Sequence, residues 1–177
     1  LYTDDPVIQV DRTAQCVISA SGRQVSYDHV VFATGSAPFV PPVEGCEQPG
    51  VFVYRTIADL DAIRAASTHA ESAIVIGGGL LGLEAAKALS DLHVDTHVVE
   101  AGPGLMLRQL DLDGATVLAE KIRTLGVHVH CNKLTERITA RGTQRVLAFA
   151  DGEELAADMI VISAGIRPRD ELALACG

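Results

Sequence analysis

The first third of the chain has short apolar runs of strand length separated by turn residues. Val7 to Asp11 is the first of these runs. Cys16 to Ala20 and Arg23 to Ser26 follow on either side of a Ser21-Gly22 turn, which predicts a hairpin. The fully apolar run Val30 to Ala33 predicts a further, buried strand. We therefore expect a small β-structure at this end.

A proline-rich segment ends this β-region. The stretch from Gly35 to Gly50 carries Pro38, Pro41, Pro42 and Pro49, so it cannot be a regular helix or a central strand. We interpret it as a crossing linker. With this linker, we expect the chain to have three parts: residues 1–55, residues 56–165, and residues 166–177, which return to the first part.

From Ile57 onward the hydrophobic period alternates between that of helices and that of strands. Helices are predicted at Ile57 to Ala66, Leu80 to Leu92 and Asp113 to Leu125. Strands are predicted at Ala73 to Ile76, Asp95 to Glu100, Val127 to Cys131 and Met159 to Ser163, with an antiparallel excursion at Leu134 to Thr139 and Arg145 to Phe149. A strand-helix-strand unit of this length forces its two strands to be parallel. The sequence predicts an α/β, Rossmann-like fold.

Composition narrows the possible partners. The chain has 14 Lys and Arg against 23 Asp and Glu, a net charge of −9, which argues against nucleic acid or an anionic membrane as partner. Its apolar stretches are far shorter than the roughly 20 residues of a membrane span. The four cysteines are widely spaced and are expected to be free thiols of a cytoplasmic protein. The first residue is Leu1, and we expect the chain to be part of a longer polypeptide.

Residues 77–82 contain the pattern Gly-x-Gly-x-x-Gly between a predicted strand and a predicted helix. Gly77 allows a sharp turn, Gly79 allows a pyrophosphate to approach the backbone, and Gly82 allows the helix to pack closely on the sheet. The amides at the helix start would then face the phosphates, where the helix dipole attracts negative charge. The candidate phosphate-binding residues are Gly77, Gly78, Gly79, Leu80, Leu81 and Gly82.

An acidic residue stands where a dinucleotide site needs one. Glu100 ends the strand that follows the glycines, and a carboxylate there can accept both hydroxyls of the adenosine ribose. It would repel a 2′-phosphate, so the sequence favours NAD(H) over NADP(H). The next cation is Arg108, which could still reach round to a 2′-phosphate and leaves NADP(H) possible.

Two further positions are candidates for the nicotinamide end. Glu84 is expected in the first turn of the glycine-led helix, where it would either favour the helix dipole or contact the nicotinamide. Ala164 and Gly165 follow the last strand at its carboxyl end, where small side chains would either leave room for the ring or pack on a neighbouring loop.

No other arrangement of catalytic or metal-binding residues is evident in the sequence. His93 and His97, and His128 and His130, form pairs, but neither pair brings a carboxylate at ligand spacing, and Cys131 should point away from His130. We expect no metal site. There is no Gly-x-Ser-x-Gly elbow and no cysteine with an obvious histidine base. We expect any chemistry to be carried by a cofactor, and we assign no catalytic residue.

Two further segments give the chain a family resemblance. Ala33-Thr34-Gly35-Ser36 and Ala164-Gly165-Ile166-Arg167-Pro168 resemble the motifs that join the two domains of the pyridine nucleotide-disulphide oxidoreductases. The resemblance implies an NAD domain inserted into an FAD domain. Residues 1–55 would be a partial FAD-domain segment containing Thr34 and Gly35, residues 56–165 the NAD(P)-binding domain, and residues 166–177 the start of the return.

Within that superfamily the chain is most similar to the flavoprotein part of the assimilatory nitrite reductases. Arg108-Gln109-Leu110-Asp111 is the most specific stretch for this resemblance. The resemblance implies hydride transfer from NADH to FAD, and an iron–sulfur cluster and sirohaem only in the longer parent protein. The superfamily's first glycine motif and its carboxyl-terminal flavin segment are not in this sequence. We therefore expect the isolated chain to be inactive.

Two alternatives stay open, and so does the chain's behaviour in isolation. A reductase of ferredoxin or rubredoxin type shares the glycine turn and the Ala-Thr-Gly segment. A non-catalytic NAD-binding module that senses redox state would share the fold alone. The expected partners are a nicotinamide dinucleotide and the remainder of the FAD domain. Exposed apolar strands also predict self-association of the chain.

Overall fold

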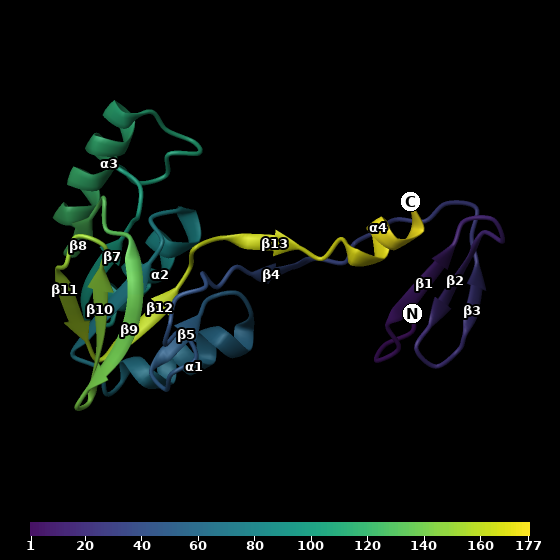
Figure 1. Cartoon of the computed structure of the whole chain (residues 1–177), viewed down its shortest axis with the longest axis horizontal. Coiled ribbons are helices and arrows are strands. Elements are labelled where there is room, and N and C mark those ends of the chain that lie inside the picture. The colour runs from purple at the N-terminus through teal and green to yellow at the C-terminus, as the bar shows by residue number, and fades with distance from the viewer. The chain divides into compact units, whose positions relative to one another are not determined.

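A computed structural model describes residues 1–177. Figure 1 traces the chain, which divides into two compact units. Unit 1 comprises Leu1–Ala37 and Arg167–Gly177, and unit 2 comprises Pro38–Ile166. No helix is both long enough and apolar enough to cross a membrane.

Unit 1 is built on a three-stranded antiparallel sheet. Its strands are β1 (Val7–Asp11), β2 (Cys16–Ser19) and β3 (Gln24–Ser26), and helix α4 (Glu171–Cys176) completes the unit. The hairpin predicted around Ser21-Gly22 is confirmed by the antiparallel pairing of β2 with β3. Asp5 ties this turn down by accepting hydrogen bonds from the Ser21 hydroxyl (2.7 Å) and amide (3.0 Å) and from the Ser19 hydroxyl (2.8 Å). These bonds, the Ser21 hydroxyl first, lower the pKa of Asp5 to about 2.

The prediction of a buried strand at Val30 to Ala33 is wrong. These residues form no strand, and Val31 is 85% exposed. An apolar run of strand length becomes a strand only where another strand offers hydrogen bonds, and none pairs with this run in the structure.

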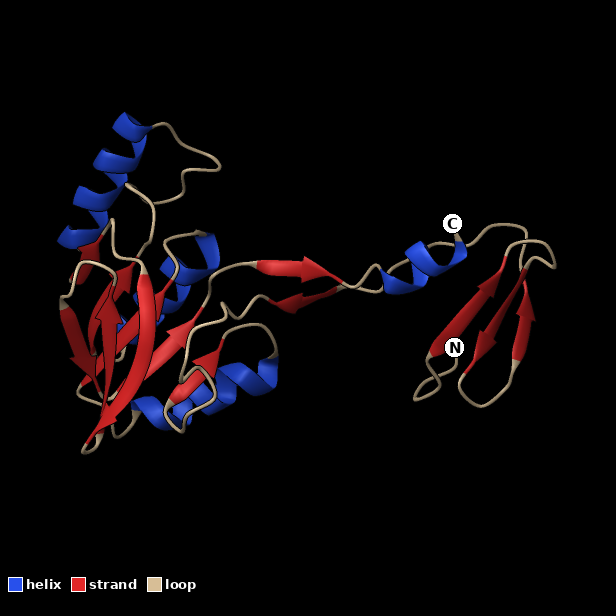
Figure 2. Cartoon of the chain, viewed as in Figure 1, coloured by secondary structure: helices blue, strands red, loops and turns tan.

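Unit 2 contains a parallel sheet with the strand order β5-β12-β6-β7-β8. Neighbouring strands are parallel throughout, which confirms the predicted strand-helix-strand unit. The sheet strands are β5 (Val51–Val53), β6 (Ser72–Ile76), β7 (Asp95–Val99), β8 (Val127–His130) and β12 (Met159–Ile162). The helices are α1 (Ile57–Ser67), α2 (Leu80–Asp91) and α3 (Leu112–Thr124), as Figure 2 shows in blue.

A second, antiparallel sheet belongs to the same unit. Its strands are β9 (Thr135–Arg141), β10 (Gln144–Phe149) and β11 (Glu154–Ala157), in the order β11-β10-β9. The excursion predicted from two apolar runs is confirmed, and β11 adds a strand that the pattern did not reveal.

The parallel sheet is buried on both faces, which explains its continuous apolar strands. On one face Ala73, Val75 and Val98 pack with Leu83 and Leu89 of α2 and with residues of α1 and α3. On the other face the parallel strands pack against the antiparallel sheet, with Ile74, Val99, Ile160, Ile138 and Leu147 in one cluster. Unit 2 thus has three layers: helices, parallel sheet, antiparallel sheet.

The boundary placed after residue 55 differs from the division in the structure. The units divide between Ala37 and Pro38, because β5 pairs with β12 and so makes the segment before residue 55 part of unit 2. The expected linker also contains β4 (Ser36–Pro38), which pairs with β13 (Ile166–Pro168). These two strands of three residues each carry too little periodicity of their own to be predicted.

Candidate functional site

The glycine turn connects β6 to α2 at the carboxyl end of the parallel sheet. Gly77 donates its amide to the Val99 carbonyl (2.8 Å), and the Ser163 amide donates to the Ile76 carbonyl (2.8 Å). The turn therefore lies between the ends of β7 and β12. The chain runs from β6 to β7 on one side, while β12 lies on the other, so this is the switch point where open α/β sheets bind ligands.

Two of the glycines are required by the protein itself. Gly77 has φ +119°, and a Cβ there would lie 2.3 Å from the Ser163 carbonyl oxygen. A Cβ on Gly82 would lie 2.0 Å from the Gly77 carbonyl oxygen. Both contacts are with backbone, which cannot move aside as a flexible side chain can. The absence of a side chain at Gly77 and Gly82 therefore allows the turn to pack closely against the helix and the sheet.

Gly79 differs from its neighbours, because nothing in the protein requires a glycine there. It is exposed, its φ is −83°, and a Cβ would meet no atom within 4 Å. Gly79 is also the N-cap of α2 and offers no side-chain hydrogen bond to the helix start. The first intrahelical bond is donated by the Leu83 amide to the Gly79 carbonyl (3.0 Å), so the amides of Leu80, Leu81 and Gly82 are left for another acceptor. The open space at Gly79 and these three free amides form a cradle that fits a phosphate group.

Glu100 lies beside this turn, directly after β7, and is partly buried. One carboxylate oxygen accepts the Gly78 amide (2.8 Å) and the other accepts the Gly102 amide (2.8 Å). Glu100 therefore fastens the glycine turn to the loop after β7, a role that the sequence did not reveal. Each oxygen has a second lone pair, so the carboxylate can still accept hydroxyl groups.

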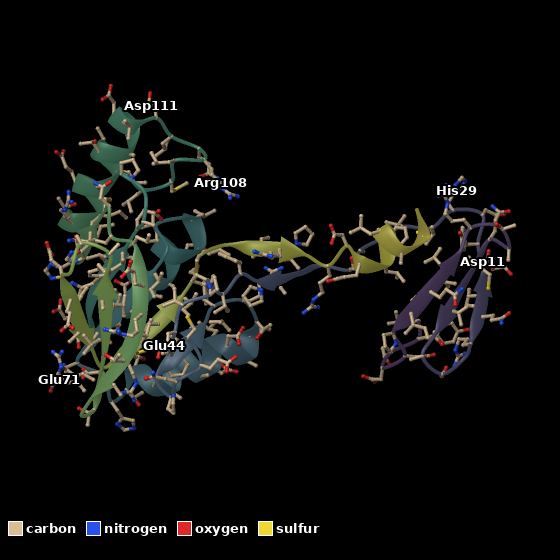
Figure 3. All side chains as sticks on the ribbon, viewed as in Figure 1. Asp11, His29, Glu44, Glu71, Arg108 and Asp111 are labelled. Carbon is tan, nitrogen blue, oxygen red and sulfur yellow. The ribbon has the colours of Figure 1, made fainter.

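The loop between β7 and α3 closes over the buried side of the turn. The Met106 amide donates to the Gly78 carbonyl (3.0 Å), and Leu105 is fully buried. Gly104 is buried too, and a Cβ there would lie 2.9 Å from the Cβ of Ala115 on α3. Arg108 is exposed on this loop, and Figure 3 shows its side chain extending outward.

Ala164 and Gly165 follow β12, where the sequence predicted them. The Phe39 amide donates to the Gly165 carbonyl (2.9 Å). The backbone of Ser163 and Ala164 contacts Gly77, since the Cα of Ala164 would lie 3.2 Å from a Cβ on that glycine. The structure thus brings the segment after β12 next to the glycine turn.

Glu84 does not lie where the sequence placed it. The first turn of α2 contains no acidic residue, and Glu84 is the fifth residue of the helix, exposed to solvent. The helix dipole acts mainly within the first turn, so the dipole interpretation of this glutamate is wrong. The helix begins at Leu80, directly after Gly79, and this start puts Glu84 beyond the first turn.

Thr34 and Gly35 belong to unit 1 and are held by Arg169. The Thr34 hydroxyl donates to the Arg169 carbonyl, and the Arg169 amide donates to the Gly35 carbonyl (3.0 Å). The Ala-Thr-Gly segment is thus joined to Arg169, the residue that follows the second family segment, by one side-chain and one backbone hydrogen bond. Gly35 has φ +70°, a conformation that favours glycine.

The sequence argument that no histidine pair has a nearby carboxylate is wrong. Asp95 lies 3.1 Å from Nε2 of His128 and 3.6 Å from Nε2 of His97. The two histidines are far apart in sequence and meet only because β7 and β8 are paired. Burial, followed by the charge of neighbouring histidines, lowers the pKa of both His97 and His130. Cys131 packs with the core under the helices, away from His130, and burial raises its thiol pKa.

The parallel sheet and its glycine turn define a dinucleotide-binding α/β domain. The chain belongs to the pyridine nucleotide-disulphide oxidoreductase family, whose model matches residues 1–177. The family resemblance and the α/β fold expected from the sequence are thereby confirmed.

Individual relatives match all or nearly all of the chain, which spans less than half of the length of each. It is 52% identical to the nitrite reductase NAD(P)H large subunit of Klebsiella oxytoca over 177 residues, which is 100% of this chain and 18% of that protein. A ferredoxin reductase structure from Rhodopseudomonas palustris has a TM-score of 0.90 and 28% identity, over 98% of this chain and 43% of that one. A water-forming NADH oxidase from Lactobacillus brevis, bound to NADH, has a TM-score of 0.84 and 25% identity, over 97% of this chain and 39% of that one.

Proposed function

We propose that this chain is the NAD(H)-binding part of an FAD-dependent oxidoreductase, the nitrite reductase NAD(P)H large subunit. The observation that carries the proposal is the open space at Gly79, next to the free amides of α2, with the Glu100 carboxylate bonded to the neighbouring Gly78 amide. The 52% identity to a nitrite reductase supports the choice of enzyme, although the chain spans only 18% of that relative.

The residues of this chain bind and orient the nucleotide. The amides of Leu80, Leu81 and Gly82 bind the pyrophosphate, and Glu100 accepts the adenosine ribose hydroxyls. Ala164 and Gly165 leave room for the nicotinamide ring beside the turn. Glu84, exposed on α2, stays a proposed contact for the nicotinamide end of the cofactor.

NADH is the preferred nucleotide in this proposal. Glu100 already accepts two amides, so its negative charge is held in place beside the ribose site and repels a 2′-phosphate. Arg108 is exposed on the neighbouring loop. It is the cation that would have to bind the 2′-phosphate of NADPH.

FAD is the acceptor in the longer protein, where it supplies the redox chemistry. Thr34 and Gly35 are the flavin-side residues of this chain in our proposal. Placing the nicotinamide against the flavin requires orientation and exclusion of water, not a side-chain acid or base, so we assign no catalytic residue.

This chain's residues do not fit the later carriers. Its four cysteines are all free thiols, and none of them belongs to a group of metal-ligating side chains. We therefore place the iron–sulfur cluster and the sirohaem of the proposed enzyme outside these residues. The unpaired thiols favour a reducing, cytoplasmic location.

A ferredoxin-type reductase is the second candidate. The TM-score of 0.90 with a ferredoxin reductase supports this candidate. Both candidates would use the same kind of nucleotide domain. The two candidates differ in the final acceptor, which a reductase assay of the full-length protein with nitrite and with ferredoxin would distinguish.

Nucleotide binding is tested by titrating the chain with NADH and NADPH and following the fluorescence of the reduced nicotinamide. The chain has no tryptophan, so the emission reports the nucleotide alone. We expect Gly79→Ala to weaken NADH binding at least about tenfold, because its methyl group occupies the cradle.

Gly142→Ala is the matched control. It also adds a methyl group into open space, but in the turn between β9 and β10, and its φ of +64° gives it a backbone cost of its own. We expect it to bind NADH as the unmodified chain does. Equal NADH affinity in Gly79→Ala and the unmodified chain would overturn the proposal.

A further inference from the structure

Three histidines and an aspartate gather on β7 and β8, away from the glycine turn. Pairing of the parallel strands sets His97 opposite His128, and Val99 opposite His130. Alternate residues of a strand share a face, so the three imidazoles lie on the same side of the sheet. Asp95 is the first residue of β7, whereas Glu100 follows its last. The cluster is therefore separate from the nucleotide site along β7.

The donor atoms of three of these residues converge. Nε2 of His128 lies 3.1 Å from one carboxylate oxygen of Asp95, and Nε2 of His97 lies 3.6 Å from the other. The three ligand atoms all lie within 4.8 Å of one another. Two donors of a tetrahedral zinc ion, with bonds of about 2.0–2.1 Å, lie about 3.3 Å apart. Both contacts with Asp95 are already close to that spacing.

We propose that Asp95, His97 and His128 bind a divalent transition-metal ion of the zinc class. Two imidazoles and one carboxylate form a ligand set that suits zinc and its neighbours, whereas calcium and magnesium need more oxygen ligands. The carboxylate supplies a negative charge to the cation. Three protein ligands leave the fourth tetrahedral position to water.

Rearrangement needed to bind the ion is small. The rings of His97 and His128 are stacked with centroids 4.6 Å apart, so one ring must rotate to bring both Nε2 atoms onto the metal. The side chains of His128 and Asp95 are 57% and 59% exposed, which leaves them free to do so. His97 is the fixed member, with 17% of its side chain exposed.

His130 positions the fixed ligand. Its Nε2 lies 2.9 Å from Nδ1 of His97, a hydrogen-bonding distance. A metal-bound imidazole commonly uses its second nitrogen in such a bond, which sets the ring orientation. Here the bond leaves Nε2 of His97 directed at Asp95.

Neighbouring cations are already engaged. Lys133 pairs with Asp151 (2.5 Å) and Glu153 (2.8 Å). The Arg123 guanidinium donates to the Val129 carbonyl (3.4 Å). The charge of Lys133 is thus partly compensated by two carboxylates, and the Arg123 guanidinium is bonded to backbone.

Calorimetric titration of the full chain with Zn²⁺ tests the proposal. We expect one ion per chain, with affinity lowered at least tenfold in His128→Gln and in Asp95→Asn. Both side chains are more than half exposed, so these variants should fold, which circular dichroism without metal checks. His69→Gln, at an exposed residue outside the cluster, is the matched control and should bind as the unmodified chain does.

Titration with Co²⁺ distinguishes this site from the thiols. Binding by imidazole and carboxylate gives ligand-field bands without the thiolate charge-transfer band that a cysteine ligand would add. The proposal is overturned if a thiolate band accompanies binding, if His128→Gln binds zinc as tightly as the unmodified chain, or if neither ion binds at millimolar concentration.

Discussion

The glycine turn combines positions with different physical requirements within six residues. Gly82 is buried against the Gly77 carbonyl, whereas Gly79 faces open space. The Gly-x-Gly-x-x-Gly spacing could be recognised in the sequence because a β-branched strand precedes it and a helix follows. Which of the glycines serve the fold and which leave space for a ligand depends on distances that only the structure gives.

Gly82→Ala should destabilise the fold much more than Gly79→Ala. At residue 82 the new Cβ would lie 2.0 Å from a backbone oxygen, so the helix must shift, at a cost of about 1–3 kcal/mol. At residue 79 the cost should stay below about 1 kcal/mol, since the methyl group meets no atom. Urea unfolding of both variants measures the difference. Equal free energies of unfolding would show that the helix does not pack on Gly77 in solution.

Glu100→Gln should reduce the preference for NADH over NADPH. The neutral amide loses charge-assisted bonds worth about 1.5–3 kcal/mol, which is roughly ten- to hundredfold in NADH affinity. Loss of the negative charge removes the repulsion of a 2′-phosphate, so NADPH affinity should fall less. Fluorescence titrations with both nucleotides give the ratio of dissociation constants. An unchanged ratio would argue against Glu100 as the ribose acceptor.

Side-chain clusters mark the limit of what the sequence reveals at the residue scale. His97 and His128 could be noted as histidines, but their meeting with Asp95 depends on the register between β7 and β8. The same holds for the Gly78 amide and Glu100, which are brought together by the turn after β7. Such contacts between distant segments carry no local pattern.

At the scale of elements, long periodic segments were predictable, whereas short ones were predictable only where a turn signal marked them, as Ser21-Gly22 marks β2 and β3. α1, α2, α3 and the parallel strands between them follow from their hydrophobic periods. β4, β5 and β13 have three residues each and depend on a neighbouring strand for their hydrogen bonds. Val30 to Ala33 shows the converse, an apolar run that finds no partner strand.

Asp158 links the starts of β6 and β12 and should make unit 2 sensitive to acid. One carboxylate oxygen accepts the amides of Glu71 (2.9 Å) and Ser72 (2.9 Å) and the Ser72 hydroxyl (3.0 Å). Burial opposes ionisation, but these bonds outweigh it and hold the pKa of Asp158 below its ordinary 3.8. A carboxyl whose pKa is lower in the folded state stabilises the fold above that ordinary value and loses the effect as the pH falls through its folded pKa.

Asp158→Asn should therefore destabilise the chain by about 1–2 kcal/mol at pH 7 and by much less in acid. Urea unfolding at neutral pH and below the pKa of Asp158 measures both values. Asp61→Asn, on the exposed side of α1, is the control and should change neither. The same loss of stability at both pH values would mean that the side chain acts by packing, not by its charge.

The division of the whole chain into two units could be foreseen only approximately. The proline-rich segment indicated a boundary, but its position depends on β5, whose pairing with β12 brings the residues after Ala37 into unit 2. The roles of the units, flavin-side and nucleotide-binding, stay proposals based on the family motifs at Thr34-Gly35 and Ala164-Gly165.

We propose that the chain self-associates through unit 1. Val31 is 85% exposed, Ile8 61% and Phe32 38%, and together they line an apolar hollow within that unit. Burying such side chains stabilises association by about 25 cal/mol for each Å² removed from water. Size-exclusion chromatography should show a species larger than a monomer, and a doubly substituted Ile8→Ser, Val31→Ser chain should shift toward the monomer. Val117→Ser, at a 66% exposed position on α3, is the control and should leave the elution unchanged. A monomeric profile of the unmodified chain at every concentration would contradict this prediction.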